Sequence, residues 1–332
     1  MNELLRYMIE EMGVYRKITK MISDKDLQPG NGHYDVAKFL KSAHENRNAL
    51  ELDYPICVPS CNNRQPSCLQ QFQYITSPIY LFIYERQKHL YEYITQKNVT
   101  KVLVPDEYLT IQKMRRYMQE YMGDQIYWML DDDIYLAHML RGRVHLWWYQ
   151  GLYILGKICE ERKLMDKFCV ASCQGNTAEA FYKGTERIGQ ILDCNAAQMY
   201  LLNGKLMREN ELYFTGDPCV NEDIELNVNM RLKNLHVLVL AGVSMSYSNE
   251  CGSKISTAST PAKVKQYTIN NYRKFGEWVK IKYTSDGGDA PVCVPRRKPV
   301  VKDPIIERFL KYQDFNGLRK YIKQQNKKKN AR

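Results

Sequence analysis

The chain has 332 residues, and 44% of them are hydrophobic, enough for one large domain or two smaller ones with a buried core. No segment approaches the roughly 18 to 20 consecutive apolar residues of a membrane span. Glu3, Glu10 and Glu11 interrupt any apolar run of a secretory leader. The ten cysteines include no zinc-type CxxC pair, which favours reduced thiols. We therefore expect a soluble, intracellular protein without a membrane span.

The positive charge is concentrated near the C-terminus. The formal net charge is +11, and residues 296–332 alone hold 13 Lys or Arg and three acidic residues, a net +10. A concentrated basic segment is typical of a surface that binds a polyanion such as nucleic acid, although charge runs also serve as solubilising tails. As a nucleic-acid surface it would contact phosphates, with salt-sensitive binding, through Lys298, Lys320, Lys323, Lys327, Lys328 and Lys329.

Apolar periodicity predicts two N-terminal helices, over residues 1–23 and 35–47, which form a helical extension up to residue 51. From residue 52 onward, strands alternate with helices. Strands are predicted at 55–59, 78–84, 101–104 and 126–130, and helices at 66–75, 86–95 and 108–122. This alternation predicts an α/β fold with a mostly parallel sheet and right-handed crossovers. No GxGxxG or GxxxxGKS/T loop is present, which argues against dinucleotide-dependent dehydrogenases and P-loop NTPases.

The second half is predicted to be mixed. Helices are expected at 146–163 and 221–231, strand-like segments at 168–172, 197–202 and 237–241, and a hairpin turn at Gly204. Residues 249–261 should form a loop and 284–290 a turn or linker. Asp303 and Pro304 predict the start of a final amphipathic helix. The predicted domains are therefore residues 1–51, 52–283 and a basic helical tail at 284–332.

The most informative stretch runs from Tyr127 to Ile134, where Asp131, Asp132 and Asp133 follow an apolar strand. Adjacent like charges repel, and burying one of them is costly unless a cation neutralises it. Carboxylate oxygens are hard ligands that suit Mg²⁺ or Mn²⁺, and open α/β sheets bind ligands at the carboxyl ends of their strands. The triplet therefore predicts a divalent-cation site; the alternative is a solvated turn that caps a helix.

A second acidic group, Glu222, Asp223 and Glu225, is predicted at a helix start, where the helix dipole keeps carboxylates ionised. Simple N-capping is the alternative for this group. Together the two groups fit a nucleotide-sugar glycosyltransferase of the GT-A type. In such an enzyme a divalent ion held by carboxylates stabilises the diphosphate leaving group as a Lewis acid. A separate carboxylate deprotonates the incoming hydroxyl.

The motifs PICVPS, LFIYE, LVP, YMQEY, YWMLDDDI and NEDIELNVNM follow in this order across residues 52–245. This series resembles the TET-associated glycosyltransferases of phages and large viruses, which are related to the base J glucosyltransferase. The resemblance implies a GT-A-like, nucleotide-sugar-binding sheet flanked by helices. It implies transfer of a hexose, glucose from UDP-glucose, to the hydroxyl of 5-hydroxymethylpyrimidines in double-stranded DNA. It also implies Mn²⁺ or Mg²⁺ and, for a viral protein, a location in the host cytoplasm or nucleus.

The resemblance also implies roles for residues near the donor. Pro59, Ser60 and Arg64 would line the nucleotide pocket, and Arg115 would lie near the donor phosphates. For Arg115, a salt bridge on the helix surface is the alternative. The acidic triplet would hold the ribose and the metal through Asp131 and Asp133, with Asp133 as the preferred metal ligand and Asp132 also in the donor site.

On the acceptor side, Glu222 and Asp223 match the acidic pair of the family, with Asp223 as the base. Trp147 and Trp148 would stack on the acceptor, for which a flipped-out base is suited; packing in the core is their alternative role. No late histidine is marked as the third metal ligand that many GT-A enzymes have.

Three other functions stay open from the sequence. The same fold would serve a transferase that acts on a glycan, lipid or protein hydroxyl. It would also serve a non-catalytic DNA-binding module with a degenerate transferase fold. Finally, the same carboxylates would suit a two-metal nuclease or phosphotransferase.

Overall fold

A computed structural model describes residues 32–63, 66–139, 144–174, 191–193, 199–247, 260–283 and 291–330. The predicted helix at 1–23, nearly all of the predicted loop at 249–261 and the predicted turn at 284–290 lie outside these residues. The chain divides into two compact units. The first runs up to Gly216 and resumes from Asn234 to the end of strand β10; the second holds Asp217–Lys233 and the described chain after residue 259. The bounds of these units differ from those of the three predicted domains, and the division into three domains stays a prediction.

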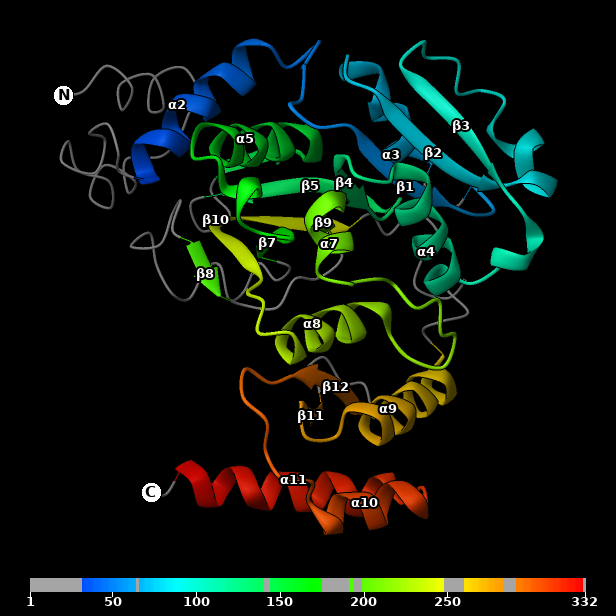
Figure 1. Cartoon of the computed structure of the whole chain (residues 1–332), viewed down its shortest axis with the longest axis vertical. Helices are drawn as coiled ribbons and strands as arrows, with labels where there is room; N and C mark the ends of the chain where they lie inside the picture. The colour runs from blue at the N-terminus through cyan, green and yellow to red at the C-terminus, as the bar shows by residue number, and fades with distance from the viewer. Residues whose placement is uncertain are drawn as a thin grey trace. The chain divides into compact units, whose positions relative to one another are not determined.

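The first unit is an α/β unit (Figure 1). Its strands are β1 (Ile56–Ser60), β2 (Ile79–Tyr84), β3 (Val99–Val104), β4 (Ile126–Leu130), β5 (Ile134–Met139), β6 (Val144–Trp147), β7 (Val170–Gln174), β8 (Ile191–Asp193), β9 (Met199–Asn203) and β10 (Leu238–Tyr247). Its helices are α2 (Gly32–Glu45), α3 (Pro66–Gln70), α4 (Ile111–Met122), α5 (Trp148–Glu161) and α7 (Gly204–Glu209), with 3-10 turns η1 (Gln71–Tyr74), η2 (Glu85–Tyr91), η3 (Asp106–Tyr108) and η4 (Leu164–Asp166).

Within the described residues, ten strands form one sheet in the order β3-β2-β1-β4-β9-β7-β10-β5-β6, with β8 paired to β10. Strands β1 to β4 are mutually parallel, and β7 and β10 are parallel to each other. Strand β9 runs antiparallel between β4 and β7, and β5 and β8 run antiparallel to β10. The predicted fold class, an α/β fold with a mostly parallel sheet flanked by helices, is confirmed.

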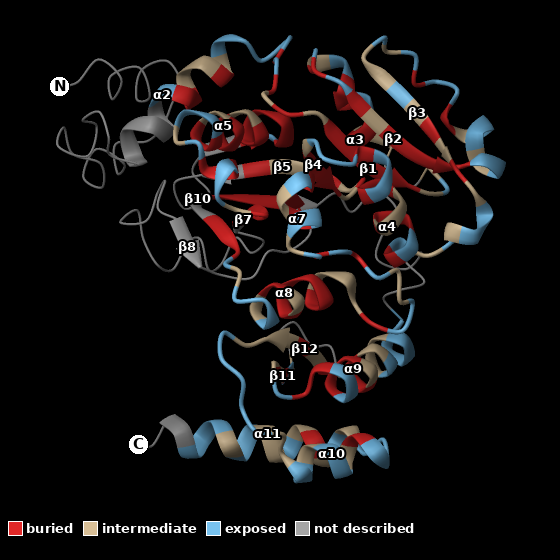
Figure 2. Cartoon of the chain, in the orientation of Figure 1, coloured by how far each residue is buried: buried red, intermediate tan, exposed pale blue. Residues whose placement is uncertain are grey.

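The two faces of this sheet are covered by different helices, because side chains alternate along each strand. Ile56 and Val58 of β1 lie in one apolar cluster with buried residues of α2, α3 and α5. Phe82 of β2 points the other way and packs edge-on against Tyr117 and Tyr121 of α4, with ring centroids 6.3 and 5.4 Å apart. Figure 2 shows β1, β4 and α5 as largely buried. The sheet is therefore the middle layer of three.

The second unit is smaller and has its own apolar core. It contains α8 (Glu222–Leu232), α9 (Pro261–Phe275), the antiparallel pair β11 (Val279–Tyr283) and β12 (Pro291–Pro295), and the C-terminal helices α10 (Pro304–Lys311) and α11 (Phe315–Asn330). Val228, Ile269, Val279 and Leu318 are among the buried residues of this core. Asp303 caps α10 as predicted, because its Oδ1 accepts a hydrogen bond from the Ile305 amide at 2.9 Å.

Several sequence expectations are corrected. The predicted helix at 86–95 is the 3-10 turn η2, and strands β5, β6, β11 and β12 and helix α9 were not predicted. Gly204 starts helix α7 and forms no hairpin. Its small size is needed because a Cβ atom there would lie 1.9 Å from the Gly123 carbonyl oxygen. No helix in the described part of the chain is both long and apolar enough to cross a membrane.

We expect Gly204→Ala to lower the free energy of unfolding by about 2 kcal/mol or more, because the added methyl group meets backbone atoms that cannot move aside. Gly156→Ala in α5 is the matched control. Its Cβ would first meet the Asp53 carboxylate at an ordinary 3.4 Å, so the better helix propensity of alanine should stabilise the protein by up to about 1 kcal/mol. Urea unfolding of both variants tests this; equal effects would contradict the close approach.

Candidate functional site at the switch point of the sheet

The carboxyl ends of β1 and β4 lie side by side. Strands β2 and β3 follow β1 outward on one side, and β4 then pairs with the other side of β1, with Ile56 opposite Trp128 and Cys57 opposite Met129. The strand order therefore reverses between β1 and β4. In open α/β sheets, this switch point is where the loops separate and ligands bind. Ser60 ends β1 here, and the acidic residues follow β4 directly.

Asp132 anchors the acidic turn to β1. This residue is 5% exposed, and its Oδ2 accepts a 2.6 Å hydrogen bond from the Ser60 hydroxyl. Ser60 gives its only proton to Asp132, so the Tyr91 hydroxyl, 2.9 Å away, donates to Ser60 and accepts from the Asn63 amide at 3.0 Å. Burial raises the pKa of Tyr91 to about 12, which keeps this donor protonated. The chain of hydrogen bonds ties the turn to β1 and the loop after it. The predicted part of Asp132 in donor binding stays a prediction.

Asp131 is held by a buried arginine on α4. Arg115 Nη2 donates to Asp131 Oδ1 at 2.7 Å, and the two side chains are 2% and 26% exposed. The Arg115 guanidinium also lies 5.2 Å from the centre of the Tyr200 ring on β9. An ion pair this well shielded from solvent is stronger than a surface pair. Arg115 contacts Asp131 in the structure, and its predicted position near the donor phosphates stays a prediction.

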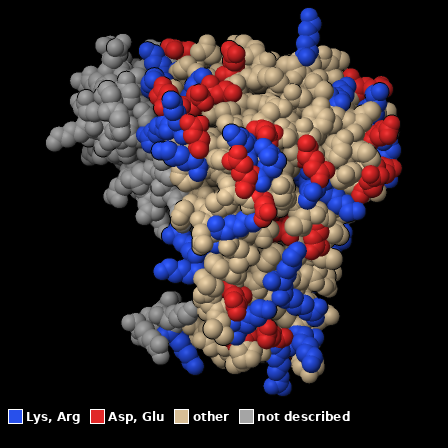
Figure 3. Space-filling model, in the orientation of Figure 1, with Lys and Arg blue, Asp and Glu red and all other residues tan. Residues whose placement is uncertain are grey.

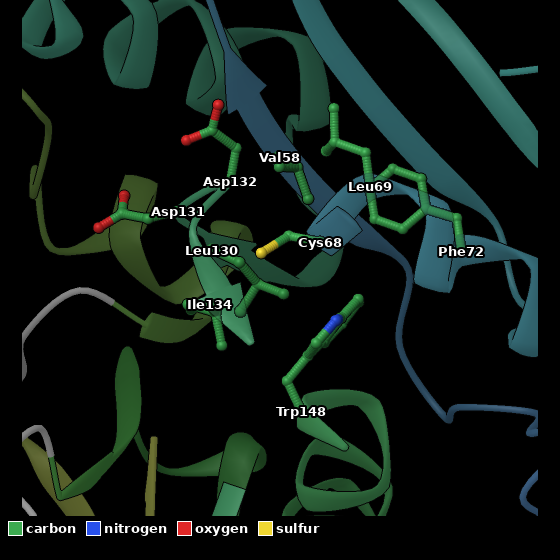
Figure 4. A pocket seen from close by; sticks show the side chains of 9 residues that line it. All are labelled: Val58, Cys68, Leu69, Phe72, Leu130, Asp131, Asp132, Ile134 and Trp148. Atoms are coloured by element: carbon green, nitrogen blue, oxygen red, sulfur yellow. The ribbon is translucent and has the colours of Figure 1, made fainter. Parts of the chain in front are cut away.

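A small pocket opens beside this turn (Figure 4). Its apolar wall contains Val58, Cys68, Leu69, Phe72, Leu130, Ile134 and Trp148, and its polar side is formed by Asp131 and Asp132. Figure 4 shows both carboxylates pointing away from Phe72 and Trp148. The pocket therefore joins an apolar wall to an anionic rim at the switch point.

The two tryptophans differ in exposure. Trp148 is 2% exposed and packs edge-on against Phe72, with ring centroids 6.2 Å apart. It packs as a core side chain in the pocket wall, which matches its alternative role, and its stacking on an acceptor stays a prediction. Trp147 is 38% exposed and lies edge-on to Tyr135 at 5.5 Å. Stacking by Trp147 stays a prediction.

The carboxylates fit a metal site that the substrate completes. Among the described residues, no group of three or more His, Cys, Asp or Glu side chains is placed to hold a metal ion. Asp131 and Asp133 are both partly exposed at the same turn. Mg²⁺ is commonly bound by one or two carboxylates together with substrate phosphates, and this donor set matches that pattern. The assignment of the metal to Asp131 and Asp133 stays a prediction.

The predicted acceptor carboxylates belong to the second unit. Glu222 and Asp223 lie in the first turn of α8 and are partly exposed. The same turn contains Glu225, which is buried and whose Oε1 accepts a 2.9 Å hydrogen bond from the Lys274 ammonium group of α9. Lys274 also pairs with Asp217 at 2.9 Å. Glu225 is therefore buried and paired, whereas Glu222 and Asp223 are partly exposed, and their action on an acceptor stays a prediction.

The remaining predicted residues are placed as follows. Pro59 is buried within β1, opposite Phe82 of β2. Arg64 lies outside the described residues, and the side chain of Lys329 is not described. The other predicted nucleic-acid contacts are all exposed in the second unit, at Lys298, Lys320, Lys323, Lys327 and Lys328. The site therefore brings together Ser60, Arg115, Asp131 and Asp132.

Two residues of the site were not predicted. Tyr91 and Tyr200 are both 0% exposed, and the chain has 25 tyrosines, so neither stands out in the sequence. One signal was available for Tyr200. It lies in the apolar segment 197–202 that was predicted as a strand, where a polar ring suggests a buried polar partner.

No protein-family model matches the chain, and no curated protein sequence matches it. Among solved structures, the chain is similar to GalNAc-T7 with UDP, GalNAc and Mn²⁺, with a TM-score of 0.42 and 16% identity over 68% of this chain and 50% of that chain. It is also similar to the UTP-bound UGPase from Acinetobacter baumannii, with a TM-score of 0.34 and 10% identity over 60% of this chain and 90% of that chain. The chain spans about half the length of the GalNAc-T7 structure. Similarities this low assign no activity.

Arg115→Met should destabilise the first unit, because it removes the cation beside the partly buried Asp131. We expect a loss of about 1–3 kcal/mol in unfolding free energy, below the full cost for a completely buried pair since Asp131 is 26% exposed. In a double-mutant cycle, adding Asp131→Asn should recover part of this loss. Arg208→Met is the control, because Arg208 pairs with Asp124 at 2.7 Å while both side chains are 56% exposed; it should change stability little. Additive effects of the Arg115 and Asp131 substitutions would contradict the pairing.

Asp217 should make the second unit sensitive to acid. Its hydrogen bonds from Lys274 and the Cys219 amide lower its pKa below the usual 3.8. A lowered folded-state pKa stabilises the fold above the unfolded pKa, and this stability is lost as the pH falls through the folded value. Asp217→Asn should therefore be less stable than the native chain above about pH 4, and the difference should shrink toward zero at lower pH. Urea unfolding across this range tests it; a difference that does not change with pH would contradict the assignment.

Proposed function

We propose that the chain is a GT-A-type glycosyltransferase that binds a nucleotide sugar at the β1–β4 switch point. The observation that carries this proposal is the acidic turn after β4, fixed there by the Asp132–Ser60 hydrogen bond and the Arg115–Asp131 ion pair. A turn that keeps Asp131 and Asp133 partly exposed, while its middle residue is buried, suits recognition of a ligand with hydroxyls and a metal-bound diphosphate.

The transfer has a simple balance of bonds. The acceptor hydroxyl oxygen forms a bond to the anomeric carbon of the sugar, and the bond from that carbon to the diphosphate oxygen breaks. The diphosphate leaves with the electron pair, and a carboxylate takes the proton of the acceptor hydroxyl. We assign this base to Asp223, with Glu222 beside it, because both are partly exposed carboxylates at a helix start.

Asp131 and Asp133 would hold a Mn²⁺ or Mg²⁺ ion together with the donor diphosphate. When bound, the ion neutralises charge on the leaving diphosphate. Arg115 holds the Asp131 carboxylate in place through their 2.7 Å hydrogen bond. Ser60 and Asp132 set the position of the turn.

For the acceptor we propose 5-hydroxymethylpyrimidines in double-stranded DNA, with UDP-glucose as donor. The support is the resemblance to the TET-associated glycosyltransferases and the exposed basic residues of the second unit. A base within a duplex does not reach a recessed site, so the modified nucleotide would be flipped out at a cost of a few kcal/mol. Trp147 is the exposed aromatic side chain that we assign to stacking on the acceptor.

The test is a transfer assay. The protein is incubated with Mn²⁺, a panel of nucleotide sugars and DNA that contains hydroxymethylcytosine or hydroxymethyluracil, and the digested nucleosides are weighed by mass spectrometry. We expect a hexose-sized gain on the modified base. Asp133→Ala should reduce the rate by roughly 100-fold or more, the size of effect seen when a charge-stabilising group is removed. Asp166→Ala, at an exposed aspartate in η4, should leave the rate unchanged.

The other outcomes separate the alternatives. Slow hydrolysis of a nucleotide sugar without transfer to DNA would keep the transferase and reject the DNA acceptor. Cleavage of DNA without any sugar donor would favour a nuclease. Neither transfer nor hydrolysis, with an intact fold, would contradict the transferase proposal and favour a binding module.

A further inference from the structure

Helix α11 is fixed on the second unit and is not a loose tail. Its Leu318 is 0% exposed, and Phe315 and Ile322 pack against the same apolar cluster. The Phe315 carbonyl oxygen accepts a 2.8 Å hydrogen bond from the Tyr283 hydroxyl of β11. The Tyr321 hydroxyl donates to Asp303 Oδ2, also at 2.8 Å. These contacts determine which face of the helix is buried and which is exposed.

The exposed face of α11 contains several lysines. Lys320, Lys323 and Lys327 are spaced three and four residues apart, so they lie on one side of the helix, with Lys328 and Gln324 beside them. The helix contains no acidic residue. Figure 3 shows Lys and Arg side chains along the part of the second unit where α10 and α11 lie, with a few carboxylates nearby.

These lysines differ from two lysines of the protein that are paired with carboxylates. Lys274 in the same unit is neutralised by Asp217 and Glu225, and Lys157 in the first unit pairs with Asp53. Among the side chains that the structure describes, no carboxylate pairs with the α11 lysines at positions 320, 323, 327 and 328. Four like charges held together on a rigid face repel one another, and an external polyanion relieves that repulsion.

We propose that this face of α11 binds the phosphate backbone of double-stranded DNA. The lysines at positions 320 to 328 extend over about 12 Å of helix, a length along which a duplex presents roughly seven phosphate charges. The side chains between and beside them are amides, Gln324 and Asn316, which bond to phosphates and base edges. This surface would hold DNA for the proposed glycosyltransferase. The proposal rests on the proposed function only in taking DNA as the acceptor.

The burial pattern favours DNA over a membrane. An amphipathic helix binds a bilayer by inserting its apolar side. The apolar side of α11 already packs against the core of the unit, through Leu318 and Ile322. The exposed side holds lysines and amides without a large apolar residue. Such a face contacts a polyanion by charge and hydrogen bonding alone.

The test measures binding without any sugar donor, so its failure and the failure of the transferase proposal are distinguishable. Fluorescence anisotropy of a labelled 30-base-pair duplex is recorded with the full chain between 50 and 200 mM salt. The variant Lys320→Gln/Lys323→Gln/Lys327→Gln/Lys328→Gln should bind at least about 10-fold more weakly at 100 mM salt, and its slope of log affinity against log salt should be shallower by about 3 to 4. All four side chains are exposed, so the fold should be unaffected.

A charge-matched control removes four exposed lysines of the first unit, at positions 88, 97, 163 and 167. It should retain both the affinity and the salt slope. An equal loss in the control would overturn the proposal, because net charge alone would then explain binding. An unchanged slope in the α11 variant would also overturn it. So would binding to phosphatidylserine vesicles or to a hairpin RNA in preference to the duplex.

Discussion

The hydrogen bond between Ser60 and Asp132 is the contact on which the candidate site depends. It joins the ends of β1 and β4 at the point where the strand order reverses, 2.6 Å from oxygen to oxygen. A carboxylate that is 5% exposed is tolerated only when its lone pairs are satisfied. The hydrogen bonds from Tyr91 to Ser60 and from the Asn63 amide to Tyr91 connect this contact to the loop after β1. The turn is thereby fixed before any ligand arrives, which is how a binding site avoids ordering costs.

Much of the fold could be predicted because its strands are apolar runs bounded by turn residues. Strand β4 was predicted with its observed bounds, and β1 and β2 to within a residue or so at each end. Expectations failed where a long-range contact decides the structure. Gly204 is required by the Gly123 carbonyl oxygen and not by a turn. Strand β5 pairs with β10, and β6 pairs with β5. The local sequence contains no sign of either pairing.

The candidate site was predictable in its residue types and less so in their roles. Ser60, Arg115 and the aspartates come together because β1 and β4 are parallel neighbours. The alternation of strands and helices implied a parallel sheet, but it did not give this strand order. Burial was not visible in the sequence. An arginine on a helix is usually solvated. Arg115 is instead 2% exposed, lies beside the Tyr200 ring and pairs with Asp131. Trp148 turned out to be core because Phe72 packs against it.

Adjacent identical residues thus acquire different chemistry from their surroundings. Asp131 faces a guanidinium and is partly exposed, whereas Asp132 faces a hydroxyl and is buried. Lysines of the second unit also differ in their surroundings. Lys274 is neutralised between two carboxylates, while the lysines of α11 share a face without acidic residues. A charged group that is paired inside the molecule contributes to the fold, and one that is held rigidly but unneutralised favours an external partner of opposite charge. In the second unit this distinction, more than residue type, marks the surface that we propose for DNA.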